Sequence, residues 1–312
     1  MMQIGSTLIK DTFAEAFRMQ FCRLGITAQD EYWLEAALKE FCGYATSVIG
    51  CDAEIGIEQR FGAAETPDGR AGAACLVFGF SSEALEKAIV NRVGQCVMTC
   101  PTSAVFDASA WSQSPLPEAT DKVVSIGRQL RFFGDGYQKS KLIRDRRFWR
   151  IPVMDGEFLV EESARVFKGV AGGNFLIESA DQETGLAALR RAIDAINLVP
   201  GTILPFPGGG VRSGSKVGSK YKGLKATTSD RHCPTLKGRV DSDLCETTNC
   251  VYEIVIDGID EHHVAMAMKQ GIEAAIGNGV VAINAGNYGG KLGKFHFRLH
   301  DVMNDKAAEN AQ

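Results

Sequence analysis

The sequence predicts an α/β protein, α+β in arrangement, with two lobes that each pack helices on an antiparallel or mixed sheet. The chain has 312 residues, which is too long for one ordinary small core and suggests about two domains. Four segments carry a helical apolar period, and strand-like runs lie between them. Each half then has the order helix, strand, strand, helix, strand. A strand before each first helix would complete a split β-α-β unit.

The four predicted helices place apolar side chains on one face at the helical period. They span residues 30–41, 81–98, 181–197 and 260–276. Asp30 stands where it would cap the first helix. The stripes expected to face the core are Trp33, Leu34, Ala37, Leu38 and Phe41; Leu85, Ile89, Val93 and Cys96; Leu186, Leu189, Ile193 and Ile196; and Val264, Met268, Ile272 and Ala275.

Strand-like runs complete the two halves. The strand before the first helix is either residues 3–9 or 24–27 in one half, and either 157–160 or 175–178 in the other. Residues 105–180 are rich in turn residues and charge, so we divide the chain into lobes 1–150 and 151–312. The segment at about 294–300, KFHFRLH, alternates and could join either lobe as a strand. The remaining predicted strands are residues 47–58, 73–80, 103–108, 201–206, 251–256 and 280–285.

Composition and charge exclude several classes of protein. A net charge of −4 gives no overall field that would attract nucleic acid or an anionic membrane. The chain shows no export signal and no run of about 18 apolar residues that could cross a bilayer. Nine cysteines, an odd number, are typical of reduced thiols in such a chain, so we expect a cytoplasmic protein.

A Gly-rich basic segment, PFPGGGVRSGSKVGSKYKG (205–223), suggests at first a phosphate-binding loop. A P-loop requires G-x-x-x-x-G-K-[ST] followed by a helix. Here Ser215 precedes Lys216, and the residues that follow have no helical period, so the N–H groups of a helix N-terminus are lacking. We therefore reject a nucleotide site. The segment is either a mobile, solvated loop or a substrate-closing element whose lysines contact carboxylates or phosphates.

Glu253 is the candidate for proton transfer. The run VYEIVIDG (251–258) is expected to be a central strand, apolar on both faces except at this residue. A carboxylate there must be ion-paired, solvated by a cleft, or kept protonated by desolvation. Two interpretations stay open: a structural salt bridge with Arg or Lys, or a carboxyl group with a raised pKa that moves protons.

Other motifs carry weaker signals. Cys96 and Cys100 are one helical turn apart, but the paired CxxC spacing of zinc sites is missing, so no metal is expected. Two more Gly-rich turns, residues 169–175 and 284–295, combine glycine with Asn, Tyr and Lys. Glycine at that density lets a backbone approach a ligand closely, although tight structural turns have the same composition.

Nine segments together resemble the formylmethanofuran:tetrahydromethanopterin formyltransferase family. Each is modest alone, but the ordered set is specific and covers the chain from about residue 5 to about residue 298. In chain order the segments are DTFAEAF, GQCVMTCPT, FFGDGY, IPVMDGEF, KGVAGGNF, PFPGGGVRSGSKVG, CPTLKG, VYEIVIDG and GNYGGKLGK.

The resemblance implies an acyltransferase of one-carbon metabolism that moves a formyl group between methanofuran and N5 of tetrahydromethanopterin. Transfer would proceed by direct attack through a tetrahedral intermediate, with no bound prosthetic group or metal. The implied fold is two ferredoxin-like lobes. The implied assembly is a homo-oligomer, dimer or tetramer, with the active site in a cleft at a subunit interface. By match to VYEIVIDG, Glu253 would be the proton-transferring carboxyl.

The substrate-binding residues are expected in the Gly-rich segments, since both substrates of the family carry acidic tails. Lys216, Lys220 and Lys291 are candidates to contact those tails. Backbone N–H groups within 172–174 or 286–289 are candidates to stabilise the oxyanion. The full predicted set is Gly172, Gly173, Asn174, Gly208, Gly209, Lys216, Lys220, Asn287, Tyr288 and Lys291.

Two alternatives to a free enzyme stay open. One is a subunit of a bacterial formyltransferase/hydrolase complex that runs towards formate together with other subunits. The other is a non-catalytic paralogue that binds pterin or methanofuran. A non-catalytic paralogue could have lost Glu253 or the Gly-rich loops, and this chain retains both.

Overall fold

The computed structural model describes residues 2–111 and 115–305, which form two compact units. Unit 1 consists of residues 1–18 and 170–312, and unit 2 of residues 19–169. This division differs from the expected lobes 1–150 and 151–312. The N-terminal segment pairs with strands from the end of the chain, and the strands just after residue 150 pair with those just before it.

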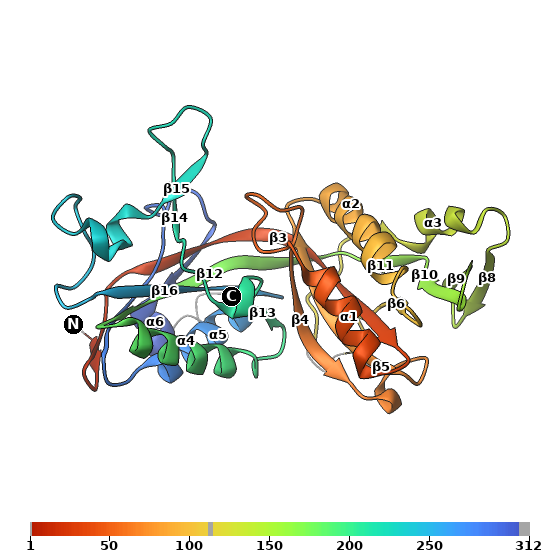
Figure 1. The fold of residues 1–312 in the computed structure, drawn as a ribbon, viewed down its shortest axis with the longest axis horizontal. Coiled ribbons are helices and arrows are strands. Elements are labelled where there is room, and N and C mark those ends of the chain that lie inside the picture. Colours follow the sequence, from red (N-terminus) through yellow and green to blue (C-terminus); the bar gives the residue numbers. More distant parts are fainter. Residues whose placement is uncertain (1, 112–114, 306–312) are drawn as a thin grey trace. The chain divides into compact units, whose positions relative to one another are not determined.

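Unit 2 contains a sheet in the order β4-β5-β3-β6-β10-β9-β8 (Figure 1). Its first four strands are antiparallel, and β10 joins β6 in parallel. The predicted strand at 24–27 is the end of β3, a single strand of 16 residues. The elements are β3 (Phe13–Ala28), α1 (Glu31–Cys42), β4 (Glu54–Phe61), β5 (Ala71–Gly79), α2 (Ser82–Arg92), β6 (Ala104–Asp107), β7 (Val123–Ser125), α3 (Gly127–Leu130), β8 (Lys139–Ile143), β9 (Arg146–Val153), β10 (Gly156–Glu161) and β11 (Ser163–Arg165).

The helices of unit 2 largely follow their predicted stripes. Asp30 caps α1 by accepting from the Trp33 N–H, and four of its five predicted stripe residues are buried. After α2 the chain forms one π-helical turn, Val93–Val97, which contains one extra residue. The extra residue shifts the apolar face, so Val97 is buried and Cys96 is only partly buried, against our expectation.

Unit 1 repeats the same strand order with a second set of strands. β17, β12, β16 and β13 are neighbours in that order, all antiparallel, and β2 joins β17 in parallel. The predicted strand at 175–178 is the end of β12. The elements are β1 (Met2–Ile4), β2 (Thr7–Ile9), β12 (Phe167–Ser179), α4 (Gln182–Ile196), β13 (Thr202–Ile203), β14 (Ser215–Val217), β15 (Ala226–Thr228), β16 (Cys250–Gly258), α5 (Glu261–Ala275), β17 (Val280–Asn284), β18 (Phe295–Arg298) and α6 (Leu299–Met303).

Helices α4 and α5 pack on each other and on one face of this sheet (Figure 1). The predicted stripe of α5 is fully buried. The stripe of α4 was partly wrong, because Leu186 is 51% exposed and the buried face is built instead from Gly185, Ala188 and Ala192. Small residues let this helix lie close to the sheet: a Cβ at Gly185 would lie 2.5 Å from the Ser179 hydroxyl.

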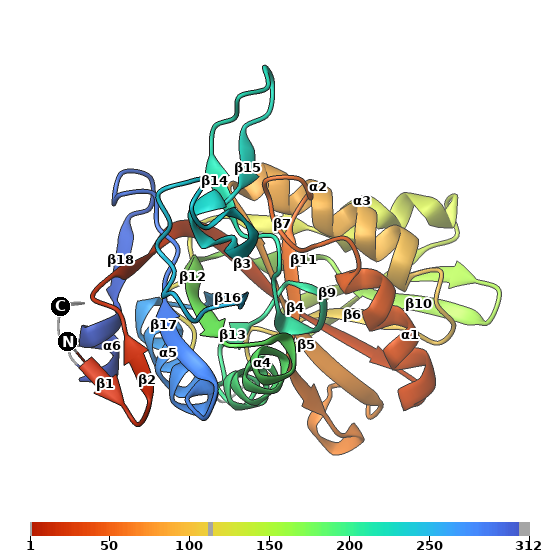
Figure 2. The same ribbon diagram turned by 60° about the vertical axis from the view of Figure 1, so that its left-hand side comes forward.

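The C-terminal strand and the segment after β13 complete unit 1. β18, the predicted strand at 294–300, pairs with Phe13–Ala16 at the start of β3. Residues 207–248 contain the β14–β15 hairpin and short 3-10 turns, and Figures 1 and 2 show the hairpin projecting from the sheet. The Gly-rich segment 205–223 therefore contains a short 3-10 turn, the first strand of an exposed hairpin and no α-helix.

The core of unit 2 encloses an ion pair. The Arg23 guanidinium donates two hydrogen bonds of 2.6 Å to Glu58, and both side chains are fully buried. A buried charge that loses its partner destabilises a protein strongly, whereas the intact pair contributes little. The structure thus depends on both members being present.

Glu58→Gln is expected to lower the free energy of unfolding by about 3–5 kcal/mol, because Arg23 would stay buried without a counter-charge. Denaturant unfolding of the whole chain measures this loss. Glu40→Gln, on an exposed position of α1, is the matched control and should change stability by less than about 0.5 kcal/mol. Equal stability of the two variants would contradict the expectation.

Candidate active site

The candidate site lies on the sheet face of unit 1 that is turned away from α4 and α5. Strand pairing places Leu176 between Glu253 of β16 and Asn284 of β17, so these three share a face. The opposite face carries Phe175 and Ile254, which belong to the helix-covered core. The alternation of β16 therefore turns Glu253 away from the core, under the segment 207–248.

The Glu253 carboxyl lacks both a hydrogen-bond donor and a positive charge among the described residues around it. Among the residues that the structure describes, none donates a hydrogen bond to this side chain or opposes its charge. Burial raises the pKa of Glu253 to about 7, because desolvation disfavours the carboxylate. No Arg or Lys of the described residues forms a salt bridge with Glu253, and a carboxyl with this pKa can both bind and release a proton near neutral pH.

Two other buried carboxylates in unit 1 are fully compensated. Glu178 lies at 0% exposure and accepts hydrogen bonds from Thr248, Asn284, the Cys245 N–H and the Lys10 ammonium. Glu15, at 1% exposure, accepts four backbone N–H groups. Glu253 differs from these two, because none of the described residues donates a hydrogen bond to its side chain.

Asn174 holds the backbone beside Glu253. Its amide donates to the carbonyls of Gly172 and Gly286, each at 3.1 Å, and accepts from the Gly286 N–H at 2.6 Å. A Cβ at Gly286 would lie 3.2 Å from the Asn174 oxygen and 3.7 Å from Glu253 Oε1. A second glycine, Gly214, approaches the other carboxyl oxygen, since its Cβ would lie 3.1 Å from Oε2. Glycines thus leave space next to both oxygens.

Tyr288 is the aromatic residue of the site. Its ring lies 6.2 Å from that of Phe17, centroid to centroid. Burial raises the pKa of the Tyr288 phenol; the charge of Glu253 raises it further, and a hydrogen bond with Ser215 opposes both. The phenol therefore stays protonated at neutral pH and keeps its ability to donate a hydrogen bond.

The loop that carries Tyr288 is fixed by Glu15 of β3. One carboxyl oxygen accepts from the N–H groups of Tyr288 (2.7 Å) and Gly290 (2.9 Å). The other oxygen accepts from the N–H groups of Leu292, at 2.5 Å, and Gly293. These bonds lower the pKa of Glu15, although desolvation by burial, the largest single influence, acts in the opposite direction. Sequence analysis missed this residue, although a charge inside the apolar run FAEAF resembles the signal that identified Glu253.

The structure brings only part of the predicted set together. Asn174 and Tyr288 lie on the side of Glu253, and Gly172 accepts a hydrogen bond from the Asn174 amide, whereas Gly209 packs towards Ile193 of α4 and Gly208 lies in an open turn. Asn287 uses its amide within the chain, donating to the Phe13 carbonyl and accepting from the Gly289 N–H. Gly209 and Asn287 thus make contacts within the chain, and the space around Gly208 is open.

The proposed oxyanion donors are mostly occupied. The Gly172 N–H donates to Asp257, and the Gly286 N–H to Asn174. The Tyr288 and Gly289 N–H groups donate to Glu15 and Asn287. Four N–H groups of the two candidate segments are therefore not free for a substrate in this conformation.

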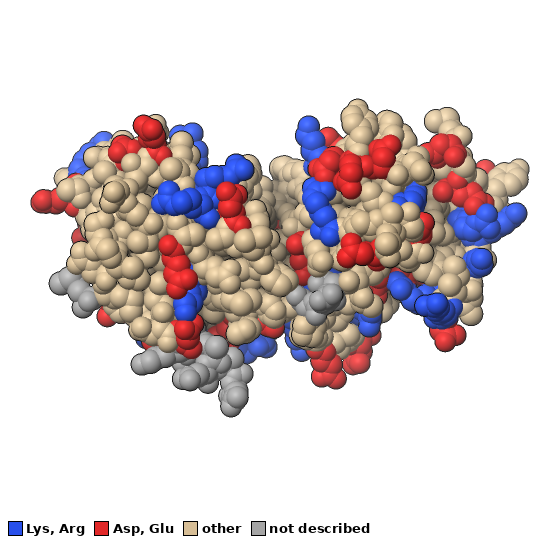
Figure 3. Space-filling model, turned by 90° about the horizontal axis from the view of Figure 1, so that it is seen from below, with Lys and Arg blue, Asp and Glu red and all other residues tan. Residues whose placement is uncertain are grey.

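The three candidate lysines are exposed. Lys216, on β14, pairs with Asp230, with 2.6 Å between Nζ and Oδ2. Lys220 lies at the tip of the β14–β15 hairpin, and Lys291 lies in the Glu15-bound loop. Elsewhere on the surface, Figure 3 shows Lys and Arg interspersed with Asp and Glu on the face that it draws.

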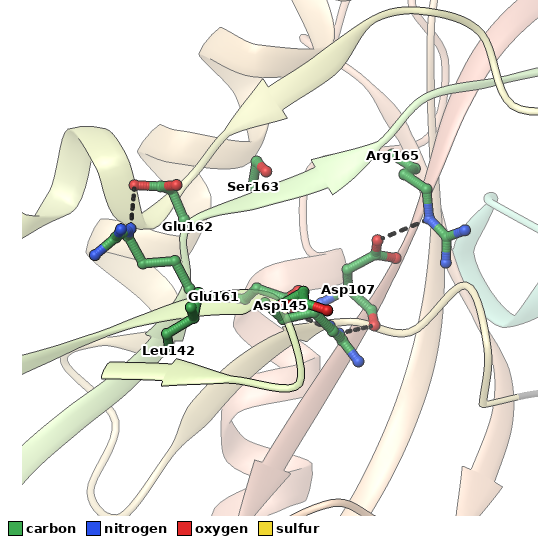
Figure 4. A pocket seen from close by; sticks show the side chains of 9 residues that line it. Asp107, Leu142, Asp145, Glu161, Glu162, Ser163 and Arg165 are labelled. Carbon is green, nitrogen blue, oxygen red and sulfur yellow. Dashed lines mark hydrogen bonds and ion pairs between the residues drawn. The ribbon is translucent and has the colours of Figure 1, made fainter. Parts of the chain in front are cut away.

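A cavity of about 580 Å³ lies in unit 2, apart from every predicted site residue. Six of the charged side chains that line it form ion pairs: Arg165 with Asp107, Arg146 with Glu161 and Arg147 with Glu162 (Figure 4). We take Glu253 rather than this cavity as the reactive centre, because its carboxyl is uncompensated.

The described residues also bear on metals and membranes. Within them, no group of three or more His, Cys, Asp or Glu side chains is arranged to hold a metal ion. All nine cysteines are free thiols. No helix in the described part of the chain is long and apolar enough to cross a bilayer.

Comparison with protein families gives two matches that together span the chain. Residues 2–153 match the model described as formylmethanofuran-tetrahydromethanopterin formyltransferase, and residues 156–302 match the model of its proximal lobe. Curated relatives of that name include one from Methylobacillus flagellatus, 51% identical over 97% of this chain and all of the relative. Another, from Methanocaldococcus jannaschii, is 48% identical with the same coverage.

Two solved structures are similar to this chain. One is the formylmethanofuran:tetrahydromethanopterin formyltransferase from Methanosarcina barkeri, with a TM-score of 0.88 and 46% identity over 96% of this chain and all of that one. The other is the formyltransferase/hydrolase complex from Methylorubrum extorquens in complex with methylofuran. There the matched chain has a TM-score of 0.88 and 44% identity, over 95% of this chain and 96% of its own length.

Glu253→Gln is expected to remove part of the change in the free energy of unfolding with pH. Between pH about 4.5 and 7 the native carboxyl binds a proton that the unfolded chain releases, so the free energy of unfolding falls as pH rises through this window. The fall attributable to Glu253 is about 3 kcal/mol, and it should vanish in the variant.

Urea unfolding of both proteins at pH 5 and pH 8 measures this difference. Glu273→Gln, at an exposed position of α5, should retain the wild-type pH slope. Parallel pH dependence in wild type and Glu253→Gln would show that the carboxyl is not desolvated in the folded protein.

Proposed function

The chain belongs to the formylmethanofuran-tetrahydromethanopterin formyltransferase family, and from this we propose that it moves a formyl group between methanofuran and N5 of tetrahydromethanopterin. The observation that carries the proposal within the site is the uncompensated Glu253 carboxyl, with a pKa near 7. Formyl transfer needs such a group, because one amine must lose a proton and the other must gain one.

The reaction is proposed to proceed by direct attack. The N5 amine attacks the formyl carbon of formylmethanofuran, and a tetrahedral intermediate forms with a negatively charged oxygen. Glu253 accepts the proton from the attacking nitrogen and delivers it to the departing methanofuran nitrogen. The C–N bond to methanofuran then breaks, and the carboxylate is regenerated. No covalent enzyme intermediate and no prosthetic group takes part in this scheme.

The neighbours of Glu253 are proposed to bind and orient the substrates. Tyr288 contributes a phenol that remains a donor at neutral pH. Asn174 fixes the backbone at Gly172 and Gly286. Gly286 adjoins Glu253 and is proposed to line the space where the reacting groups bind. Gly173 contributes indirectly, because a Cβ there would lie 2.2 Å from Val264 and would displace β12. Lys216, Lys220 and Lys291 are proposed to contact the acidic tails.

Architecture, assembly and location are also proposals. The order β17-β12-β16-β13 in unit 1 and β6-β3-β5-β4 in unit 2 supports two ferredoxin-like lobes. We propose a homo-oligomer, a dimer or tetramer, in the cytoplasm. Membership in a formyltransferase/hydrolase complex is the second candidate, supported by the structural similarity to one chain of such a complex. Co-purification with other subunits would favour the second candidate.

Glu253→Gln is expected to lower turnover by about 100-fold or more, because an amide cannot shuttle the proton. The assay follows formyl transfer between formylmethanofuran and tetrahydromethanopterin, with Glu273→Gln as the matched control. Size-exclusion chromatography and circular dichroism should show an unchanged assembly and fold. Turnover near the wild-type rate would assign Glu253 a structural role only.

Neutralising the lysines is expected to weaken binding more than chemistry. Lys220→Gln and Lys291→Gln should each raise KM more than they lower kcat, since the contacts to substrate tails are the same in ground and transition states. Lys216→Gln should do so less, because this lysine is already paired with Asp230. Steady-state kinetics test this pattern, and a fall in kcat at constant KM would remove these residues from the binding role.

A further inference from the structure

The loop 286–293 has little regular structure that would stabilise its conformation. It forms no helix or strand, and Gly289 and Gly290 both adopt left-handed backbone conformations, with φ of 73° and 72°. Four of its N–H groups converge on the carboxylate of Glu15, two on each oxygen. A carboxylate offers about four acceptor positions, so Glu15 has its hydrogen-bonding capacity filled by this single loop.

Glu15 and Phe17 act on the same residue from the same strand. They stand two positions apart on β3, so their side chains leave the same face of the strand. Glu15 binds the Tyr288 N–H at 2.7 Å, and the Phe17 ring lies against the Tyr288 ring. The backbone and the aromatic ring of Tyr288 are thus held by two neighbours in β3. The same loop approaches Glu253 at Gly286, where a Cβ would lie 3.7 Å from Oε1, and the charge of Glu253 acts on the Tyr288 phenol.

We propose that Glu15 is a positioning residue for the reaction: its carboxylate holds the loop 286–293 in the one conformation that presents Tyr288 beside Glu253. This inference rests on the proposed formyl transfer. Glu15 itself is buried to 1% exposure and saturated by backbone donors, so it neither contacts substrate nor exchanges a proton during turnover. Its effect is transmitted through Tyr288.

The test uses Glu15→Gln in the full chain. Glutamine has the same size, but its NH₂ group would face N–H donors and could satisfy none of them, so about half of the contacts are lost. Hydrogen exchange at the amides of Tyr288, Gly290, Leu292 and Gly293 should become faster. The value of kcat should fall by up to about 100-fold, as expected for misplacement of a group in the site, and KM should change much less.

A double-mutant cycle with Tyr288→Phe separates positioning from general structural damage. If Glu15 acts through Tyr288, Glu15→Gln should cost far less activity in the Tyr288→Phe background than in wild type. Glu15→Asp keeps the charge with one methylene fewer and should recover part of both the exchange protection and kcat. It also serves as the readout should Glu15→Gln fail to fold. Glu273→Gln is the neutral control.

The outcomes distinguish the two proposals. Fully additive losses, or wild-type kcat despite rapid exchange in the loop, would overturn the positioning role and leave the formyl transfer intact. Full activity of Glu253→Gln would instead overturn the assigned mechanism, whatever Glu15 does. Unchanged exchange in Glu15→Gln would show that the loop does not depend on this carboxylate.

Discussion

Desolvation of one partly buried carboxyl group, with no counter-charge among the described residues, is the constraint around which unit 1 is arranged. Several polar groups of unit 1 are engaged with partners other than Glu253. Lys10 is held by Glu178, and the N–H groups of the 286–293 loop are held by Glu15. The Asn174 amide is held by Gly172 and Gly286. A carboxyl with an open partner nearby would become an ordinary salt bridge with a low pKa.

A desolvated carboxyl without a partner lowers the stability of the folded protein. A desolvated carboxyl opposes folding above its unfolded pKa, and the apolar face of the same strands offsets that cost. Ile254 and Ile256, one and three positions after Glu253, point the other way and are fully buried in the core that α4 and α5 cover. One strand therefore contributes both the reactive group and the core packing that tolerates it.

Local patterns in the sequence were enough to predict most helices and strands of the fold and some residues of the candidate site. The helices and the central strands follow from apolar period and caps, because these signals depend on neighbouring residues only. The buried face of α4 could not be predicted from apolar period. Small residues such as Gly185 and Ala188 form this face, because the helix packs closely on the sheet. The π-turn after α2 likewise depends on tertiary contacts. Glu253 was found because it interrupts one strand pattern, whereas the role of Glu15 depends on a loop more than 270 residues away.

The discontinuity of unit 1 has a consequence for how the chain is made. Unit 2 is one continuous stretch, residues 19–169, and can fold as soon as it leaves the ribosome. Unit 1 cannot close until β17 and β18 have been synthesised, because the N-terminal strands β2 and β3 pair with them. At about 5–20 residues per second, the first strands wait roughly ten seconds or longer with exposed edges. The pairing of β2 and the start of β3 in unit 1 is therefore completed late in synthesis.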